Sequence, residues 1–376
     1  MIRQYKLRDY NFRLVLALIA LTSLGVLLVG SADSSLQSRQ LMGMILGLIV
    51  MVVVSLMDFS WILNFYWIIY GCNALLLLAV RLFGDDANGA TRWISIGGFT
   101  FQPTELAKII VIVFFAKFFM EHEEELNTLR NLVKSAVLIL IPLILIYIQP
   151  DLKNTITVVI LFCIIIYMAG LSYKIIGGAI LIAVPLAVVF LFIVIQPDQK
   201  LIKSYQRDRI MSFLNAEEDE YSDDVAQQEN SVMAIGSGQL TGKGLNNNEV
   251  SSANKGNFVS ENQTDFIFSV AGEELGFIGC TAILLLLLFI IFECIRTSLR
   301  AKDMAGRLIC CGMAALIGIQ SFINVAVVTN IMPNTGTPLP FVSYGLTSMV
   351  SLYIGMGLVL NVGLQKAKTY REVEKS

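Results

Sequence analysis

Long apolar runs, each of about 17 residues or more, recur along this chain and limit what it can fold into. A helix of about 20 residues spans the ~30 Å hydrocarbon core of a bilayer. Hydrophobic residues make up 56% of the chain and charged residues only 15%, a balance unlike that of a soluble domain. The sequence therefore predicts an all-α polytopic membrane protein with about ten transmembrane helices. The predicted spans are 14–30, 41–57, 61–83, 104–120, 132–149, 155–170, 175–196, 266–294, 307–331 and 344–365.

Basic residues indicate which ends of these helices face the cytoplasm. They gather in three segments, before the first span, after residue 294 and at the C-terminal end: Arg3, Lys6, Arg8, Arg13; Arg296, Arg300, Lys302, Arg307; Lys366, Lys368, Arg371 and Lys375. The positive-inside rule places all three segments in the cytoplasm, which requires an even number of spans. The first run lacks a convincing cleavage site, so we interpret it as a retained helix rather than a signal peptide. We expect a multi-pass protein with both termini cytoplasmic.

Residues 197–264 form the one long stretch without a predicted span, and this topology places them outside, between the seventh and eighth helices. We therefore treat residues 1–376 as one membrane domain that contains a long extracellular loop. The loop opens with QKLIKSYQRDRIMSFL, whose mixture of apolar and basic residues predicts an amphipathic helix at the outer interface. The acidic run AEEDEYSDD that follows is typical of a solvated turn. The six cysteines lie in or beside apolar runs, which indicates buried thiols rather than disulfides or a metal site.

Charged residues inside apolar runs are costly, so each needs a reason. In RWISIGGFTFQPTELAKIIVIVFF, Glu105 and Lys108 are three residues apart and share one face of a helix that begins near Pro103. One interpretation is that Glu105 meets the helix dipole while Lys108 extends outward to the surface. The other is that Glu105, Lys108 and Arg92 of the preceding outer loop form a pocket for an anion.

Two further outer segments carry candidate residues. Asp151 in QPDLKNT either caps the helix that follows or belongs to a site. The glycine-rich IGSGQLTGKG resembles a phosphate-binding loop, but Gly236 and Gly242 are separated by five residues where that motif needs four, and Lys243 is followed by glycine. Such a basic, flexible turn can still approach a phosphate through its backbone N–H groups.

The stretch NFVSENQTDFIFSVAGEELGFIG places Asp265 directly before the eighth apolar run. Asp265 either caps that helix or acts in a site. Glu273 and Glu274 follow about 12 Å further along the helix, so we take them as candidates for groups at the membrane midplane, where a transport path needs polar residues.

The last outer loop, MPNTGTPLPFVSYG, includes Pro338, Pro340 and Ser343. So many prolines and glycines prevent a regular helix, and an irregular segment of this kind must pack against protein or line a cavity. The other candidates, apart from Glu273 and Glu274, lie on the same outer side. This one-sided arrangement favours a reaction on a lipid-linked substrate at the membrane surface.

At this point the chain resembles a known family. RWISIGGFTFQPTELAKI, PDL, IGSGQLTGKG, TDFIFSVAGEELGFIG and PNTGTPLPFVSYG occur in the order and spacing of the SEDS proteins (shape, elongation, division and sporulation), which include RodA, FtsW and SpoVE. The resemblance extends from the first predicted span to the last, and the short tails are most similar to the RodA branch. It implies a ten-helix glycosyltransferase that polymerises lipid II into peptidoglycan strands outside the cytoplasmic membrane, with a class B penicillin-binding protein as its transpeptidase partner and no role for nucleic acid.

The resemblance also assigns residues. The essential aspartate of the family falls on Asp265, its paired Glu and Lys on Glu105 and Lys108, and its PDL aspartate on Asp151. Its proline-rich loop falls on residues 337–345. The chain departs from the family where PDLGT is PDLKNT, where a histidine before TDF is Gln263, and where SYGGSS is SYGLTS.

These assignments lead to a mechanistic hypothesis. Transfer with inversion at the donor sugar needs a single general base, for which Asp265 is our candidate. Lys108, with Arg92 and Lys243 behind it, is expected to stabilise the leaving pyrophosphate, and Glu105 to orient Lys108. A divalent cation could share this work, although the sequence shows no clear set of oxygen ligands. Two alternatives remain open. One is a lipid II flippase, which Glu273 and Glu274 favour slightly, and the other is a non-catalytic scaffold.

Overall fold

The computed structural model describes residues 9–87, 90–96, 99–196, 222–246 and 258–365, together with residues 202, 207, 210, 211, 213 and 256. Most of the predicted amphipathic helix and most of the acidic run after it lie outside the described residues.

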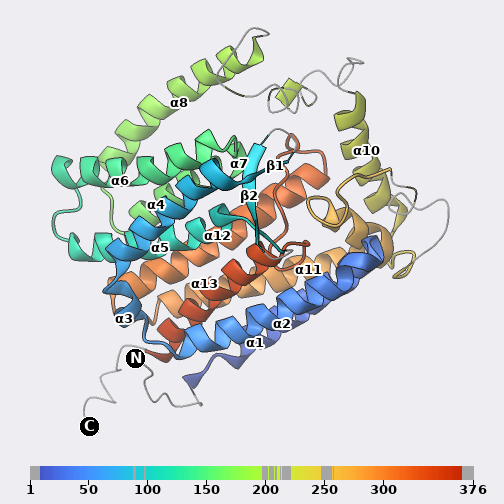
Figure 1. Cartoon of the computed structure of the whole chain (residues 1–376), viewed down its shortest axis with the longest axis horizontal. Coiled ribbons are helices and arrows are strands. Elements are labelled where there is room, and N and C mark those ends of the chain that lie inside the picture. Colours follow the sequence, from blue (N-terminus) through green and yellow to red (C-terminus); the bar gives the residue numbers. More distant parts are fainter. Residues whose placement is uncertain are drawn as a thin grey trace.

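Helices dominate the described chain (Figure 1). They are α1 (Phe12–Ala32), α2 (Ser34–Leu56), α3 (Phe59–Leu63), α4 (Tyr66–Phe83), α5 (Pro103–Glu121), α6 (Leu129–Ile148), α7 (Leu152–Met168), α8 (Tyr173–Ile195), α10 (Ser222–Ser237), α11 (Ile267–Ser298), α12 (Met304–Val328) and α13 (Leu346–Leu364). Each predicted span overlaps one of these helices. Within the described residues, eight helices are long and apolar enough to cross a membrane. The prediction of a helical polytopic membrane protein is confirmed.

Two helices that coincide with predicted spans, α5 and α7, are not among those eight. Helix α7 has only 17 residues, and α5 carries Glu105, Lys108 and Lys117 along its length. Most residues of α5 are buried, because it packs against α4, α7, α12 and α13. A helix surrounded by protein can carry charged side chains because they do not face the hydrocarbon of the bilayer. The position of α5 in the bundle therefore explains how its charges are tolerated.

Helix α8 has the opposite environment. In its most apolar stretch of 18 residues the mean hydropathy is 3.1, and only 6% of that stretch is buried. In Figure 1 it runs apart from the other helices at the edge of the molecule. An apolar helix without protein around it is stable only where lipid covers it, because its side chains have no favourable contact with water.

At one end of the bundle the start of α1 meets the last part of α11, and the end of α13 meets the α11–α12 connection. The Asn11 side chain, at the start of α1, donates a hydrogen bond to Glu293 at 2.8 Å. Lys302, between α11 and α12, donates to Gln365 at the end of α13. The two ends of the described chain therefore lie at the same end of the bundle, as an even number of spans requires.

Asp58 belongs to this same end of the bundle, at the turn between α2 and α3. Gln365 donates to its carboxylate at 2.8 Å, as does the backbone N–H of Ser60 at 2.9 Å. Burial raises the pKa of Asp58, but these hydrogen bonds and the nearby charge of Lys302 together hold it below its ordinary value. The ionised form of Asp58 is thus stabilised by the fold.

The opposite end carries a small antiparallel sheet of three strands, β1 (Asp85–Ala87), β2 (Ala90–Ile96) and β3 (Phe99–Phe101), in the order β1-β2-β3. Asp85 pairs with Trp93, and Ile94 pairs with Phe101. The apolar runs of the sequence predicted no strands here. The segment ISIGGFTF has β-branched and aromatic residues on both sides of a glycine pair, which is a hairpin signal that the expectation of an all-helical chain obscured.

Helix α10, in the long loop, was not predicted either. Its buried Gln228 donates hydrogen bonds to the carbonyls of Val327 and Met332, both at 2.9 Å. Its Ser231 hydroxyl donates to the carbonyl of Val328 at 2.8 Å. The carbonyls of Val327 and Val328 belong to the last turn of α12, where helical partners are lacking, and that of Met332 belongs to the segment after the helix. Helix α10 therefore caps α12 and fixes the start of the loop that follows.

Helix α11 is broken at Gly276, whose φ of 63° and ψ of −162° are not helical. The glycine-rich segment at residues 238–244 lies against the break and pairs with the backbone groups that it exposes. The N–H groups of residues 243 and 244 donate to the carbonyls of residues 273 and 274, and those of residues 277 and 278 donate to the carbonyls of residues 239 and 240. A broken helix at membrane depth needs such partners. The N–H groups of residues 243 and 244, which belong to the predicted phosphate-binding turn, therefore donate to backbone carbonyls of α11.

This arrangement also corrects the expectation for Glu273 and Glu274. Glu273 forms an ion pair with Lys243 at 2.9 Å, and Glu274 accepts a hydrogen bond from Ser31 in the last turn of α1. Both partners belong to the end of the bundle that carries the sheet. The prediction that these two carboxylates lie at the membrane midplane is wrong, because their partners place them near the outer ends of α1 and α11.

Candidate active site

The site begins at the first turns of α5. Pro103 occupies the start of the helix, a position where its missing N–H costs nothing. Lys108 donates to Glu105 at 2.7 Å, and the two side chains are only 1% and 5% exposed. The interpretation in which Lys108 extends outward to the surface is therefore wrong. The pair is a buried ion pair near the sheet end of the bundle.

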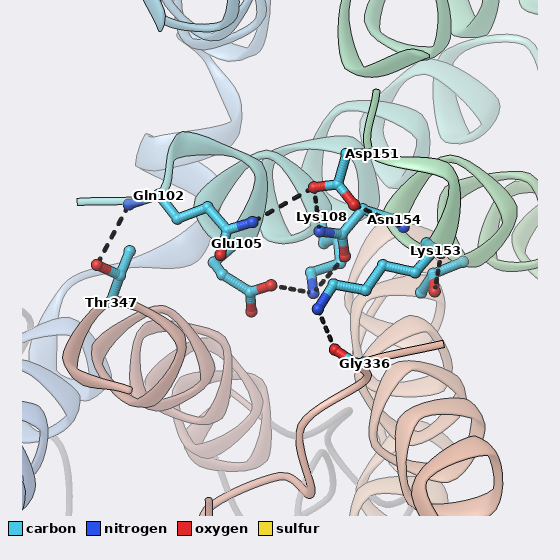
Figure 2. Close-up of polar contacts among 9 residues, drawn as sticks. Gln102, Glu105, Lys108, Asp151, Lys153, Asn154, Gly336 and Thr347 are labelled. Atoms are coloured by element: carbon cyan, nitrogen blue, oxygen red, sulfur yellow. Dashed lines mark hydrogen bonds and ion pairs between the residues drawn. The ribbon is translucent and has the colours of Figure 1, made fainter. Parts of the chain in front are cut away.

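Asn154 and Asp151 connect this pair to α7 (Figure 2). The amide oxygen of Asn154 accepts from Lys108 at 3.2 Å, and its amide nitrogen donates to Asp151 at 2.8 Å. Gln102 adds a second donor to Asp151 at 3.3 Å. Asp151 also accepts from the backbone N–H of Asn154 and so caps α7. The interpretation of Asp151 as a helix cap is thus confirmed, and its membership of a functional site stays a prediction.

Arg92 of strand β2 lies beside this network. Its guanidinium donates to the carbonyl of Gln149 at 3.4 Å and to the carbonyl of Pro150. These contacts attach strand β2 to the turn that precedes Asp151. The role of Arg92 toward an anion stays a prediction.

The proline-rich loop, residues 332–345, packs over the network. Lys153 donates to the carbonyl of Gly336 in this loop (Figure 2). The Ser343 hydroxyl accepts from the N–H of Leu339 at 2.7 Å and donates to the carbonyl of Thr264 at 2.6 Å. Leu339 lies between Pro338, which is half-buried, and Pro340, which is buried. Ser343 therefore holds the stiff loop against the turn that carries Asp265.

Asp265 is half-buried in the turn before α11. The cap position of that helix is Phe266 and receives no side-chain hydrogen bond, so Asp265 does not cap it. Asn324 of α12 donates to the carbonyl of Asp265 at 2.7 Å and to the carbonyl of Thr337 at 2.8 Å. Among the described residues, the Asp265 carboxylate has no hydrogen bond and no ion pair. It is a fixed but uncommitted carboxylate.

Lys243 makes its described contacts elsewhere. Besides its ion pair with Glu273, it lines a cavity of about 290 Å³ next to α10, together with Asn230, Met233, Ala234, Ser237, Phe258 and Glu273. The structure brings Glu105, Lys108 and Asp151 into one network and links it through the proline-rich loop to Asp265. Lys243 is not in contact with that network within the described part of the chain.

Several residues of this site were not singled out in advance for it: Gln102, Lys153, Asn154 and Asn324. A signal existed for Asn324, because an amide in an otherwise apolar helix needs a hydrogen-bond partner. Lys153 and Asn154 were visible only as departures from the family pattern. Nothing in the sequence says which acceptors these side chains reach.

The residues of the site do not fit a divalent cation. Within the described residues, no three histidine, cysteine, aspartate or glutamate side chains come together. Glu105 is occupied by Lys108, and Asp151 by two side-chain amides. We therefore derive no step through a metal ion.

Fold and site together define a class: a multi-pass helical membrane protein with a buried charged network and an uncommitted carboxylate at one end of its bundle. The chain belongs to the cell cycle protein family of FtsW, RodA and SpoVE, whose family model matches residues 10–368. The family to which the sequence motifs pointed is thereby confirmed.

Two of the similar proteins match almost the full chain. It is 34% identical over 371 residues to the probable peptidoglycan glycosyltransferase FtsW of Geobacter sulfurreducens, covering 95% of this chain and 96% of that protein. It is 32% identical over 350 residues to the peptidoglycan glycosyltransferase MrdB of Escherichia coli K12, covering 93% and 91%.

Solved structures share the fold. The rod shape determining protein RodA of Thermus thermophilus superimposes with a TM-score of 0.71 at 26% identity, covering 96% of this chain and 98% of that one. A chain from a structure described as the coordination of polymerization and crosslinking by a peptidoglycan synthase complex superimposes with a TM-score of 0.76 at 28% identity, covering 94% and 97%.

Proposed function

We propose that this protein is a peptidoglycan glycosyltransferase that polymerises lipid II at the outer face of the bacterial cytoplasmic membrane, with Asp265 as its general base. The observation that carries this assignment is the uncommitted carboxylate of Asp265. Asn324 holds the backbone carbonyl of this residue, and the proline-rich loop ties its turn to the buried Glu105–Lys108 pair. The names of the relatives support the reaction class. Both chain termini are cytoplasmic in this proposal, because the basic connection between α11 and α12 and the two ends of the described chain lie together at the end of the bundle opposite the site.

The proposed reaction forms one bond and breaks another. The 4-hydroxyl of the acceptor's N-acetylglucosamine attacks the anomeric carbon of the donor's N-acetylmuramic acid, and its proton passes to the Asp265 carboxylate. The bond from the anomeric carbon to the diphosphate oxygen breaks, and its electron pair leaves with undecaprenyl pyrophosphate. A positioned general base contributes about 10²- to 10⁴-fold to such a transfer. Because the configuration inverts, no covalent sugar intermediate is needed.

The charge that develops on the leaving diphosphate needs a preorganised cation. Lys108 meets this need because Glu105 and Asn154 hold its ammonium in a site that is 1% exposed. A fixed cation does not have to reorganise as the bond breaks, which is the main source of electrostatic catalysis. In this role Glu105 is a positioning residue that acts through Lys108.

The apolar surfaces of the bundle suit a substrate with a long lipid tail, which reaches the site by diffusion within the membrane. We propose a class B penicillin-binding protein as the partner that crosslinks the product strands. The similarity to a chain of a peptidoglycan synthase complex supports an association of this kind.

A lipid II flippase is the main alternative, and the structure weakens its support in the sequence. Glu273 and Glu274 were taken as polar groups of a transport path. They are instead paired with Lys243 and Ser31 near the outer ends of their helices. A scaffold without chemistry would have no use for an uncommitted Asp265 beside a buried ion pair.

The test is polymerisation of purified lipid II by the detergent-solubilised protein, alone and with its penicillin-binding partner, comparing wild type with Asp265→Asn. Glycan ladders from the wild type alone, with a folded mutant that still binds its partner, support the assignment. Equal ladders from both proteins would remove Asp265 from the chemistry. Lipid II translocation into vesicles without any ladder would instead favour the flippase.

A further inference from the structure

Lys153 has a use that the proposed mechanism does not yet include. It is the second residue of α7, directly after Leu152 and the capping Asp151, and its side chain is half-buried. Figure 2 shows the side chain extending from α7 to the carbonyl of Gly336 in the proline-rich loop. This carbonyl is the acceptor that the ammonium reaches, and an ammonium has three N–H donors. The Lys153 ammonium therefore has further N–H groups that can donate to a ligand.

The charge of Lys153 is not balanced by its surroundings. Among the described residues its ammonium has no ion pair with a carboxylate. The two nearby acids are committed, Glu105 to Lys108 and Asp151 to the amides of Gln102 and Asn154. The first turn of a helix is also the end where the dipole disfavours a cation. An unpaired ammonium in this position is therefore unfavourable for folding, whereas a bound anion would satisfy both the ammonium and the helix.

Lys153 also lies between the two parts of the site. Its neighbour Asn154 holds the ammonium of Lys108 at 3.2 Å. Its acceptor Gly336 directly precedes Thr337. The side-chain amide of Asn324 donates one hydrogen bond to the carbonyl of Thr337 and another to the carbonyl of Asp265. An anion bound by Lys153 would thus sit where the charged network and the base-bearing turn are joined.

We propose that Lys153 is a second cation for the diphosphate of the lipid-linked donor, working beside Lys108. This inference rests on the proposed function, because the diphosphate is that of the proposed donor. The donor diphosphate is esterified at both ends and carries one negative charge on each phosphate, and it gains one more charge as it takes the electron pair of the breaking bond. Two ammonium groups on neighbouring helices can share that charge, one on each phosphate. Lys153 also draws the proline-rich loop onto the bound headgroup through Gly336.

The test is direct binding, which does not depend on turnover. Farnesyl diphosphate, a short lipid diphosphate, is titrated calorimetrically into the purified full-length protein in detergent, with farnesol as the probe that lacks phosphate. Lys153→Met is expected to weaken farnesyl diphosphate binding about tenfold or more and to leave farnesol binding unchanged. Lys153→Arg, which keeps the charge, is expected to stay within about threefold of wild type. Lys134→Met, at an exposed lysine in α6, is the matched control.

The outcomes separate this inference from the proposed function. Undiminished binding of farnesyl diphosphate by Lys153→Met, in a protein that polymerises lipid II, would overturn the inference and leave the function intact. Binding that depends on Lys153, in a wild type that makes no glycan, would support the diphosphate site and overturn the glycosyltransferase. Inorganic diphosphate is expected to bind at least tenfold more weakly than farnesyl diphosphate. Equal binding of the two would assign the site to a free anion and refute the lipid-linked ligand.

In the polymerisation assay, Lys153→Met is expected to lower kcat more than it raises KM. An interaction that strengthens as charge develops appears in kcat, whereas one that is equal in ground and transition states appears in KM. A lysine that served only to tether the loop would alter folding but would not distinguish farnesyl diphosphate from farnesol. A mutant that loses the binding of both probes alike would therefore refute the assignment of Lys153 as a diphosphate ligand.

Discussion

The buried pair of Glu105 and Lys108 allows a prediction that separates folding from chemistry. Both side chains are almost inaccessible, at 5% and 1% exposure, and their charged atoms are 2.7 Å apart. Lys108→Met leaves a buried carboxylate without a cation, and Glu105→Gln leaves a buried ammonium without an anion. Breaking a buried pair in this way costs about 3–5 kcal/mol. The double mutant buries no charge at either position and should cost far less than the sum.

The expected coupling energy is therefore about 3 kcal/mol, at the upper end of values between contacting residues. The measurement is the free energy of unfolding in mixed detergent micelles for the wild type, both single mutants and the double mutant. Lys117 and Glu121, on the same helix, supply the control. They form a 3.1 Å ion pair that is 17% and 38% exposed, for which a coupling of about 0.2–1 kcal/mol is expected.

Activity should not follow stability in this series. The double mutant is expected to regain most of the stability that Lys108→Met loses, yet its polymerisation rate should stay about 10²-fold or more below wild type, because the cation for the leaving group is gone. Additive stability effects, or a coupling no larger than in the exposed control pair, would refute the description of a buried ion pair. A double mutant that polymerises normally would refute the role of Lys108 in the reaction.

Three more predictions follow from the fold. In a thermal unfolding assay Gly276→Ala should strongly destabilise the protein, because φ is 63° and a Cβ would come within 2.3 Å of a backbone nitrogen. The control is Gly71→Ala, where a Cβ meets nothing within 4 Å and which should be neutral in the same assay. Asn324→Ala, which removes both hydrogen bonds from α12 to the Asp265 turn and the proline-rich loop, should lower kcat about tenfold or more while the protein still binds its partner; normal kcat would argue against positioning by Asn324. The fold lowers the pKa of Asp58, so its carboxylate stabilises the protein at pH values above the unfolded pKa of about 3.9. This contribution is lost as the pH falls through the folded pKa. The difference in unfolding midpoint between wild type and Asp58→Asn should therefore persist at neutral pH and shrink only in strong acid.

Much of the fold could be predicted because membrane insertion depends on local properties of the sequence. Apolar runs of sufficient length identify the helices, and basic residues orient them. The same reasoning missed the sheet at residues 85–101 and helix α10, because both lie in segments without the long apolar runs on which it relied. It also misplaced Glu273 and Glu274 at the midplane, because it assumed a regular helix through Gly276 and could not see the segment that packs against the break.

For the site, the sequence by itself determined which residues carry charge near the outer ends of the helices, since a spacing of three residues puts Glu105 and Lys108 on one helical face. It also placed Asp265 at the end of an apolar helix. Only the tertiary structure decided that Lys108 is buried, that Asp265 caps nothing, and that Asn324 holds the base-bearing turn. The reason is physical: hydropathy and helical spacing are fixed within one segment, whereas burial and hydrogen-bond partners depend on which distant segments meet.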